Sequence, residues 1–190
     1  MYLPNEFRGD EALGWELAAE EAFGLLLAGD DVAPLPFVVD RERRALRAHL
    51  ARASRTLRDR DGASVVFFGP HGYVTPRWYA APREQVPTWN YVIVRMQGAV
   101  APLSREGTAR VLEELCARFE PPGGYDPSWI DPALHDQLLD AITGIEIAVE
   151  RVEVKLKLSQ NRDPEDRRRV RDGFAATHPA LAAWMDRVAR

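Results

Sequence analysis

The chain has 190 residues, 46% of them hydrophobic and 28% charged, which is enough to bury one core and suits a single domain over 1–190. Its 25 basic and 29 acidic residues give a formal net charge of −4, which argues against a protein that works mainly by gripping phosphate backbones but leaves room for a local basic patch. The one cysteine, Cys116, excludes an internal disulfide and fits a reducing compartment.

The start of the chain has no basic segment followed by an apolar run, so no signal peptide is expected. The longest apolar runs are far shorter than the roughly 20 residues that span a bilayer. We therefore expect a soluble, cytoplasmic protein that does not enter a membrane.

Short apolar runs predict four strands in the first part of the chain, at 23–27, 35–39, 46–50 and 64–68. The last run is rich in β-branched and aromatic residues, and we expect Gly69 and Pro70 to end it. A longer strand is predicted at 89–100. One of its faces carries Val92, Val94, Met96 and Val100, and the other carries Tyr91, Ile93, Arg95 and Gln97. The second face is apolar at its start, so another element or a ligand is expected to cover that end.

A further strand begins with the alternating residues Ile145, Ile147 and Val149, and the alternation resumes one residue out of phase at Val152 and Val154. A slip of one residue turns side chains to the other face of a strand. The pattern therefore predicts a β-bulge near Glu150 and Arg151.

Apolar residues at helical spacing predict two helices, one with Val111, Leu112, Leu115, Cys116 and Phe119 and one with Leu134, Leu138, Leu139 and Ile142. Asp131 and Asp163 each precede a proline, which is the pattern of an N-cap before a proline at the first helical position. The tail, 163–190, is predicted to be helical. Its apolar stripe of Leu181, Trp184, Met185 and Val188 must pack on this subunit or on a partner.

Polar and aromatic residues gather in segments 69–79, 86–91 and 155–162, and less densely in 47–54. A flat, conjugated, anionic cofactor needs ring faces around it and charge-assisted donors at its anionic end. The segments offer ring faces from Trp78, Tyr79, Trp89 and Tyr91, and anion donors from Arg52, Ser54, Lys157, Ser159 and Arg162. Aromatic residues beside prolines also form corners of ordinary cores, so the residues alone leave both interpretations open.

Five motifs occur in a fixed order: Met-Tyr-x-Pro at 1–4, His-Leu-Ala-Arg-Ala at 49–53, Phe-x-Gly-Pro-x-x-Tyr-x-x-Pro-x-Trp-Tyr at 67–79, Val-Pro-Thr-Trp-Asn-Tyr at 86–91 and Lys-Leu-Ser-Gln-Asn-Arg at 157–162. Together they resemble the PaiB-like family of FMN-binding transcriptional regulators, over residues 1 to about 175. The sequence departs from that family at Ser54, where the family usually has Asn, and at 34–36, where Pro-Leu-Pro replaces the frequent His-Leu-Pro.

The resemblance implies an α+β, mainly β fold: an FMN-binding split β-barrel with peripheral helices and a helical C-terminal tail. It also implies a homodimer with FMN, a small-molecule ligand, at the subunit interface. The cofactor-binding residues that it implies are His49, Arg52, Ser54, Tyr73, Trp78, Tyr79, Thr88, Trp89, Asn90, Tyr91, Lys157, Ser159 and Gln160. Of these, Lys157, Ser159 and Arg52 are expected at the anion end of the pocket, and no catalytic residue is identified.

The same family includes haem-dependent piperazate synthases, which form an N–N bond from N5-hydroxyornithine. Haem b needs an axial ligand, most often histidine. His49 is the candidate metal ligand, because it is expected on a strand, whereas His71 is expected in a loop. His49 can equally be a hydrogen-bonded residue at the edge of the pocket. His135 and His178 are expected to face solvent.

Three hypotheses therefore remain: a flavin-binding regulator or sensor, a haem enzyme of the piperazate-synthase kind, and a structural relative without a cofactor. No helix-turn-helix is recognisable, so the regulatory role rests on the resemblance. The arginine runs at 41–44 and 167–169 are interleaved with acids and resemble exposed turns or helix faces. DNA stays open as a partner that the net charge does not support.

Overall fold

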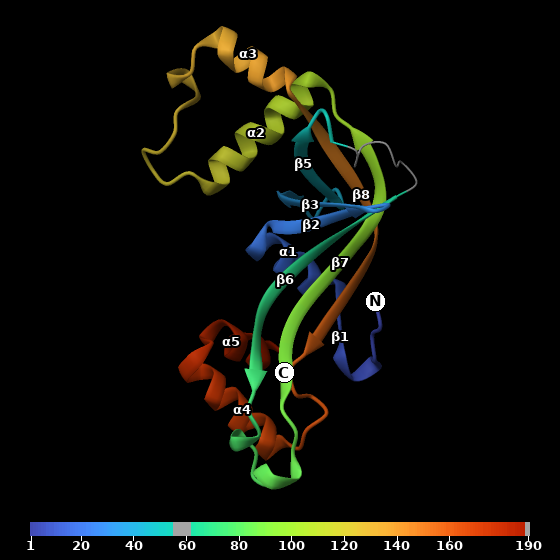
Figure 1. Ribbon diagram of the computed structural model, residues 1–190, viewed down its shortest axis with the longest axis vertical. Helices are drawn as coiled ribbons and strands as arrows, with labels where there is room; N and C mark the ends of the chain where they lie inside the picture. Colours follow the sequence, from blue (N-terminus) through green and yellow to red (C-terminus); the bar gives the residue numbers. More distant parts are fainter. Residues whose placement is uncertain (55–61, 189–190) are drawn as a thin grey trace. The chain divides into compact units, whose positions relative to one another are not determined.

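The computed structural model describes residues 1–54 and 62–188. The chain forms two compact units, each built from separate segments. Unit 1 comprises Met1–Leu17, Phe68–Val94 and Glu153–Arg190, and unit 2 comprises Ala18–Phe67 and Arg95–Val152. That the two form a single domain stays a prediction. Among the described residues, hydrogen-bonded strands follow the order β3-β2-β6-β7-β8-β5-β4, with β1 paired to β8 (Figure 1).

Unit 2 holds most of the strands. They are β2 (Phe23–Ala28), β3 (Asp31–Pro36), β4 (Val38–Asp40), β5 (Ala45–Ala51) and parts of β6 (Ala63–Val74), β7 (Thr88–Pro102) and β8 (Ile142–Lys157). Antiparallel ladders join β2 to β3, β2 to β6, β4 to β5 and β5 to β8. β3 also contacts β5, so the two ends of the strand order approach each other, as a curled sheet requires. The rings of Phe37 and Phe67 meet edge to face at 5.5 Å in its core.

The helices of unit 2 are α2 (Arg105–Phe119) and α3 (Pro132–Asp140), with a short 3-10 turn, η5 (Pro127–Trp129), before α3. Asp131 caps α3 as predicted, since its carboxylate accepts from the backbone N–H of Ala133 and Leu134. α2 packs against β5, and the hydroxyl of Thr108 on α2 accepts from the backbone N–H of Gly144 at 2.9 Å. A Cβ at Gly144 would lie 2.8 Å from that hydroxyl, so this close approach needs glycine.

Unit 1 contains η1 (Asn5–Phe7), β1 (Arg8–Gly9), the start of α1 (Glu11–Glu21), η3 (Pro76–Trp78), η4 (Pro82–Glu84), α4 (Pro164–Thr177) and α5 (Pro179–Arg187). Asp163 caps α4 by accepting from the N–H of Asp166 at 2.9 Å, as predicted. The apolar stripe of the tail packs within this chain: Leu181, Trp184 and Met185 are buried. A Cβ at Gly72 of β6 would lie 2.6 Å from the ring of Phe174 and 3.2 Å from Leu181. Residues 189–190 of the tail lie outside the described residues.

Several predicted boundaries were wrong. β6 does not end at Gly69 but continues to Val74, and the alternation of burial along it changes phase between Pro70 and His71. A change of phase accommodates a proline within a strand, because the residue then leaves the regular ladder. His71 therefore lies on a strand and not in a loop. The strand predicted at 35–39 is divided between β3 and β4 at Phe37.

Two further differences concern helices. Ile142 begins β8 instead of ending α3, and Leu134 and Leu138 of the expected apolar stripe are exposed. α1 was not predicted, because its alanine- and glutamate-rich sequence has no stripe of large apolar residues.

The change of phase expected at Glu150 and Arg151 is confirmed by the burial pattern: two consecutive exposed residues interrupt the alternation, while the strand β8 itself continues. Within the described ranges, the helices are all too short or too polar to cross a membrane.

Candidate functional site

The predicted site residues fall into two groups by unit. His49 lies on β5 in unit 2, and Arg52 and Ser54 lie in the turn that follows. The other ten lie in unit 1, on β6, β7, β8 and the segments next to them: Tyr73, Trp78, Tyr79, Thr88, Trp89, Asn90, Tyr91, Lys157, Ser159 and Gln160.

Unit 1 has an apolar cavity of about 590 Å³ on one face of its strands. It is lined by Met1, Tyr2, Phe68, Gly69, His71, Trp89, Tyr91, Val92, Ile93 and Lys155. Strand alternation explains most of the lining, because Trp89, Tyr91 and Ile93 project from one face of β7 while Asn90 and Val94 are buried on the other. This is the face whose apolar end was predicted to be covered by another element or a ligand.

Trp89 is the central ring of this face. Half of its surface is exposed (50%), and it contacts His71 and Tyr73 of β6, with ring centroids 5.7 Å and 6.2 Å away. Tyr73 meets it edge to face at 74°. Phe68 on β6 is also more than half exposed (54%). Apolar rings that a strand pair leaves open to solvent in this way offer a platform for a flat ligand.

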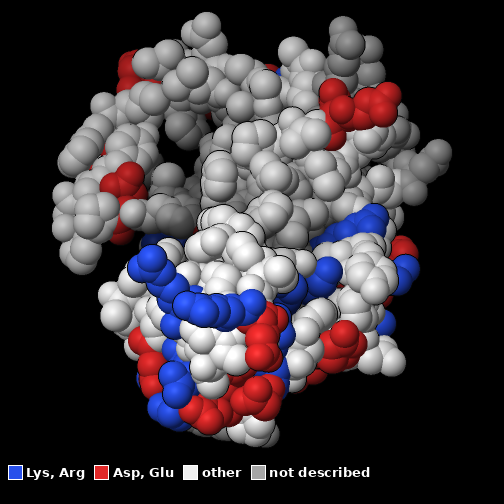
Figure 2. All heavy atoms as spheres, turned by 60° about the horizontal axis from the view of Figure 1, so that its bottom comes forward, with Lys and Arg blue, Asp and Glu red and all other residues white. Residues whose placement is uncertain are grey.

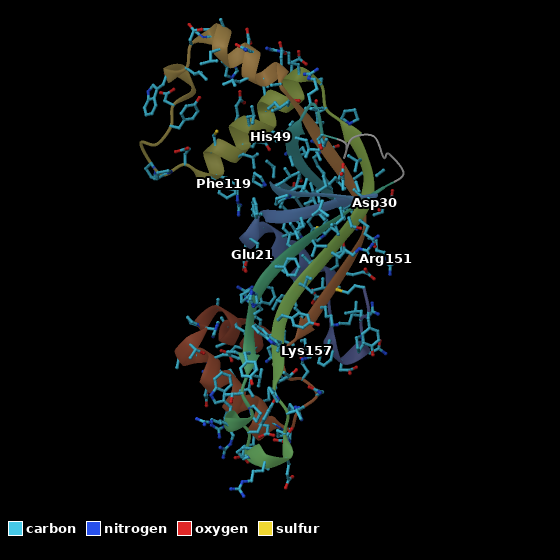
Figure 3. The ribbon with its side chains drawn as sticks, viewed as in Figure 1. Glu21, Asp30, His49, Phe119, Arg151 and Lys157 are labelled. Atoms are coloured by element: carbon cyan, nitrogen blue, oxygen red, sulfur yellow. The ribbon has the colours of Figure 1, made fainter. Side chains whose placement is uncertain are left out.

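The two lysines of the chain, Lys155 and Lys157, project from the same face of β8 (Figure 3 labels Lys157). The Lys155 ammonium lies 5.6 Å from the ring centre of Tyr91 and 5.4 Å from that of Tyr2, whose carbonyl oxygen accepts its hydrogen bond. Lys157 donates to the hydroxyl of Thr88 and to the carbonyl of Trp89, both at 2.6 Å. Burial lowers the pKa of Lys157, and the positive charges of Lys155 and Arg162 lower it further.

Asn90, Ser159 and Gln160 are bonded to one another or to the backbone. The Asn90 amide donates to the Ser159 hydroxyl at 2.9 Å, and both residues are buried. The Gln160 amide donates to the carbonyl of Leu156 and its oxygen accepts from the N–H of Leu158. Ser159 has a φ of 64°, a left-handed conformation that the hydrogen bond with Asn90 helps to hold. These three residues fix the turn after β8 against the start of β7.

Tyr79 and Trp78 lie beneath the helices that follow β8. Tyr79 is buried, and the Arg162 guanidinium lies 4.9 Å from its ring centre. Trp78 packs edge to face on Phe174 of α4, with centroids 5.0 Å apart. The sequence left two interpretations of these aromatic residues open, and the contacts of Trp78 and Tyr79 are those of corners of an ordinary core.

In unit 2, His49 is half-buried on β5, opposite Gly144 of β8 (Figure 3). Burial lowers its pKa, which favours the neutral imidazole. The Arg52 guanidinium donates to the carbonyl of Ile142 at 3.2 Å, and the Ser54 N–H donates to that of Ala51. Nowhere in residues 1–54 and 62–188 do three His, Cys, Asp or Glu side chains come together to hold a metal ion.

The sequence did not identify Phe68, Lys155 or the first two residues as parts of the site. The sequence did contain a signal for three of them: Met1 and Tyr2 belong to a matched motif, and Lys155 is two positions before Lys157 and so lies on the same face of the strand. Phe68 was treated as the end of a strand. Assembled as they are, these residues can hold a flat, apolar ring system that carries a negative charge at one end.

The family model described as "Putative FMN-binding domain" matches residues 1–151. The chain is 32% identical over 178 residues to the protease synthase and sporulation protein PAI 2 of Bacillus subtilis, with 87% of this chain and 85% of that protein covered. It is 33% identical over 153 residues to an uncharacterized protein of Aspergillus fumigatus, with 68% of this chain and 59% of that protein covered.

Two solved structures share the fold at low identity. They are the flavocytochrome Anf3 from Azotobacter vinelandii (TM-score 0.64, 14% identity, 84% of this chain and 73% of that one covered) and a FAD and heme binding protein from Mycobacterium smegmatis (TM-score 0.59, 16% identity, 83% and 76% covered). The α+β, mainly β split-barrel fold is thereby confirmed. The chain is PaiB-like and belongs to the family described as the Putative FMN-binding domain.

Proposed function

We propose that this chain binds a flavin, FMN, in the apolar cavity of unit 1. The observation that carries the proposal is the exposed ring of Trp89, which contacts His71 and Tyr73 and lines a cavity that Lys155 also lines. Membership of the family supports it, since the family model describes an FMN-binding domain. The two structural relatives, a flavocytochrome and a FAD and heme binding protein, also support a flavin.

The residues of the cavity fit the group. A ring system of three fused rings matches an apolar space of about 590 Å³, since cavities of roughly 300–1,000 Å³ hold drug-sized ligands. Trp89 and Tyr91 would orient the ring, and Phe68 would exclude water from it. Lys155, and Lys157 two residues further along the same face of β8, would hold the phosphate by charge-assisted hydrogen bonds. A bound flavin supplies one- and two-electron redox chemistry.

The absorption spectrum of the purified chain tests the proposal, followed by titration with FMN and riboflavin. We expect flavin bands or saturable FMN binding, weakened at least tenfold in Lys155→Met and largely restored in Lys155→Arg, which keeps the charge. A chain that neither retains nor binds FMN would overturn the proposal. Binding that is equal in wild type and Lys155→Met would remove Lys155 from the site.

Haem is a second candidate, favoured by the half-buried His49. Its lowered pKa keeps the imidazole neutral near pH 7, and the neutral form is the one that binds iron. A Soret band after incubation with haemin, lost in His49→Ala and kept in His71→Ala, would support this candidate, including activity of the piperazate-synthase kind. His71 is a matched control because it lies on a strand too. If no Soret band appears, haem is refuted and FMN is the one cofactor still proposed.

We further propose that two copies assemble into a homodimer in the cytoplasm. Phe68, Tyr73 and Trp89 expose large apolar surfaces on one face, and a second subunit would cover them. The free thiol of Cys116 supports a reducing compartment. Sedimentation should give twice the mass of the 21.4 kDa chain, and a monomer at micromolar concentration would contradict the dimer. Regulation of transcription remains a proposal supported by the likeness to PaiB.

A further inference from the structure

A second hollow, of about 670 Å³, lies on the two C-terminal helices of unit 1. It is lined by Gln160, Arg162, Pro164, Arg167, Arg168, Arg171, Asp172, Met185 and Asp186, and it shares no residue with the apolar cavity. Figure 2, which turns the bottom of Figure 1 forward, shows basic side chains in a band beside acidic ones on the part of the molecule that carries these helices. The hollow also lies beyond residues 1–151, the part that the family model matches.

The charges of the hollow do not cancel. Four arginines face two aspartates, which leaves an excess of two positive charges. Arg171 is neutralised by Asp186, with three contacts between 2.7 and 3.3 Å, and Arg168 pairs with Asp172 at 3.3 Å. Arg162 and Arg167 are the other two, and neither has a carboxylate partner among the described residues.

Arg162 and Arg167 are held in place by neutral groups. Arg162 stacks on Tyr79 at 4.9 Å and donates to the side-chain oxygen of Gln85 at 2.8 Å. Arg167 donates to the carbonyl of Met185 at 3.3 Å. Each guanidinium has five N–H donors, so most of them stay available to a ligand. Both residues are half-buried, so their side chains are ordered before a ligand arrives and little entropy is lost on binding.

We propose that this hollow binds the phosphate group of a small molecule. Paired guanidinium groups match phosphate geometry, because each offers two parallel N–H donors. The volume of the hollow is that of a site for one small ligand. The carboxylates of Asp172 and Asp186 disfavour an extended polyanion along the same surface, since their charges would oppose its neighbouring phosphates. The site is separate from the flavin cavity and does not depend on it.

Calorimetric titration with inorganic pyrophosphate, in a buffer without phosphate, tests the site. Wild type should bind one pyrophosphate per chain, and Arg167→Gln and Arg162→Gln should each weaken binding at least tenfold. Arg169→Gln is the matched control. It removes the same charge from the same helix, but Arg169 pairs with Glu165 at 2.8 Å and does not line the hollow. It should leave the affinity unchanged.

Arg162→Gln also removes the contact of Arg162 with the buried Tyr79. Arg168 is exposed, so Arg168→Gln is a second variant that leaves the fold intact, and it should weaken binding severalfold. Equal losses in Arg168→Gln and Arg169→Gln would indicate general electrostatic attraction and overturn the site. No pyrophosphate binding by wild type would overturn it as well. Binding of a 20-base-pair DNA duplex that depends on Arg167, without pyrophosphate binding, would make nucleic acid the partner and refute the small-molecule proposal.

Discussion

Replacement of Trp89 by alanine should weaken flavin binding about thirtyfold while the fold persists. A tryptophan side chain can bury about 250 Å², so the exposed half of Trp89 offers about 125 Å² to a ligand. A flat ligand on one ring face covers about half of that area, worth about 1.5 kcal/mol at about 25 cal/mol per Å². Offset stacking adds about 0.5 kcal/mol or more. The total of about 2 kcal/mol corresponds to about a thirtyfold change in affinity.

Quenching of flavin fluorescence during titration of FMN measures this change. Trp129→Ala is the matched control: Trp129 is also exposed (69%), but it lies on η5 in unit 2 and does not line the cavity. It should bind FMN like wild type. Trp89→Ala removes the contacts of this ring with His71 and Tyr73. Because Trp89 is half exposed, we expect the variant to lower the free energy of unfolding by no more than about 1 kcal/mol in addition to the cost of losing those contacts. Equal FMN affinities in wild type and Trp89→Ala would refute the placement of the flavin on this ring.

Three further predictions concern other residues. Lys157→Ala should weaken FMN binding tenfold or more, as the loss of a charge-assisted contact of about 1.5–3 kcal/mol implies, but riboflavin, which lacks the phosphate, should lose less than threefold; equal losses would contradict a phosphate contact. Burial lowers the pKa of His49, so the unfolded chain binds more protons than the folded one as pH falls from the ordinary value of 6.5 through the lowered pKa, and the free energy of unfolding should drop across that window. Thermal melts should show a smaller drop in His49→Gln, and a drop equal to that of wild type would contradict this role of His49. Gly98→Ala should cost about 3 kcal/mol or more in chemical denaturation, because its Cβ would lie 1.7 Å from the carbonyl oxygen of Ala148, and wild-type stability would contradict that close approach.

The strands were predictable where local pattern decides them. Alternation placed the faces of β7 correctly, and the two aspartates before prolines marked the starts of α3 and α4. The end of β6 was predicted wrongly because of Pro70. Whether a strand tolerates a proline depends on the ladder position that the proline occupies, and the partner strands set that position. α1 was missed for the opposite reason: its helical propensity is local, but its two large buried residues, Trp15 and Leu17, are two positions apart and not at helical spacing, so the sequence shows no apolar stripe.

The candidate site was predictable in part. Thr88, Trp89 and Lys157 come from two motifs far apart in the sequence, and the structure joins them by hydrogen bonds. Which polar residues turn toward a ligand and which toward each other was not predictable, as Asn90 and Ser159 show. Their burial depends on the packing of Met185 from α5, whose sulfur lies 3.9 Å from the Asn90 amide. Motif spacing carries no information about such a contact.

The position of the two lysines has a consequence for chemical labelling. The chain has 25 basic residues, and Lys155 and Lys157 are the two lysines among them, both on the cavity face of β8. Among the side chains, a reagent that acylates or reductively methylates amines therefore modifies those on this one face, because arginine does not react with it. The lowered pKa of Lys157 leaves more of its amine unprotonated and so more nucleophilic. Mass spectrometry of the labelled chain, with and without FMN, would thus be a footprint of the cavity in which protection of either lysine marks an occupant.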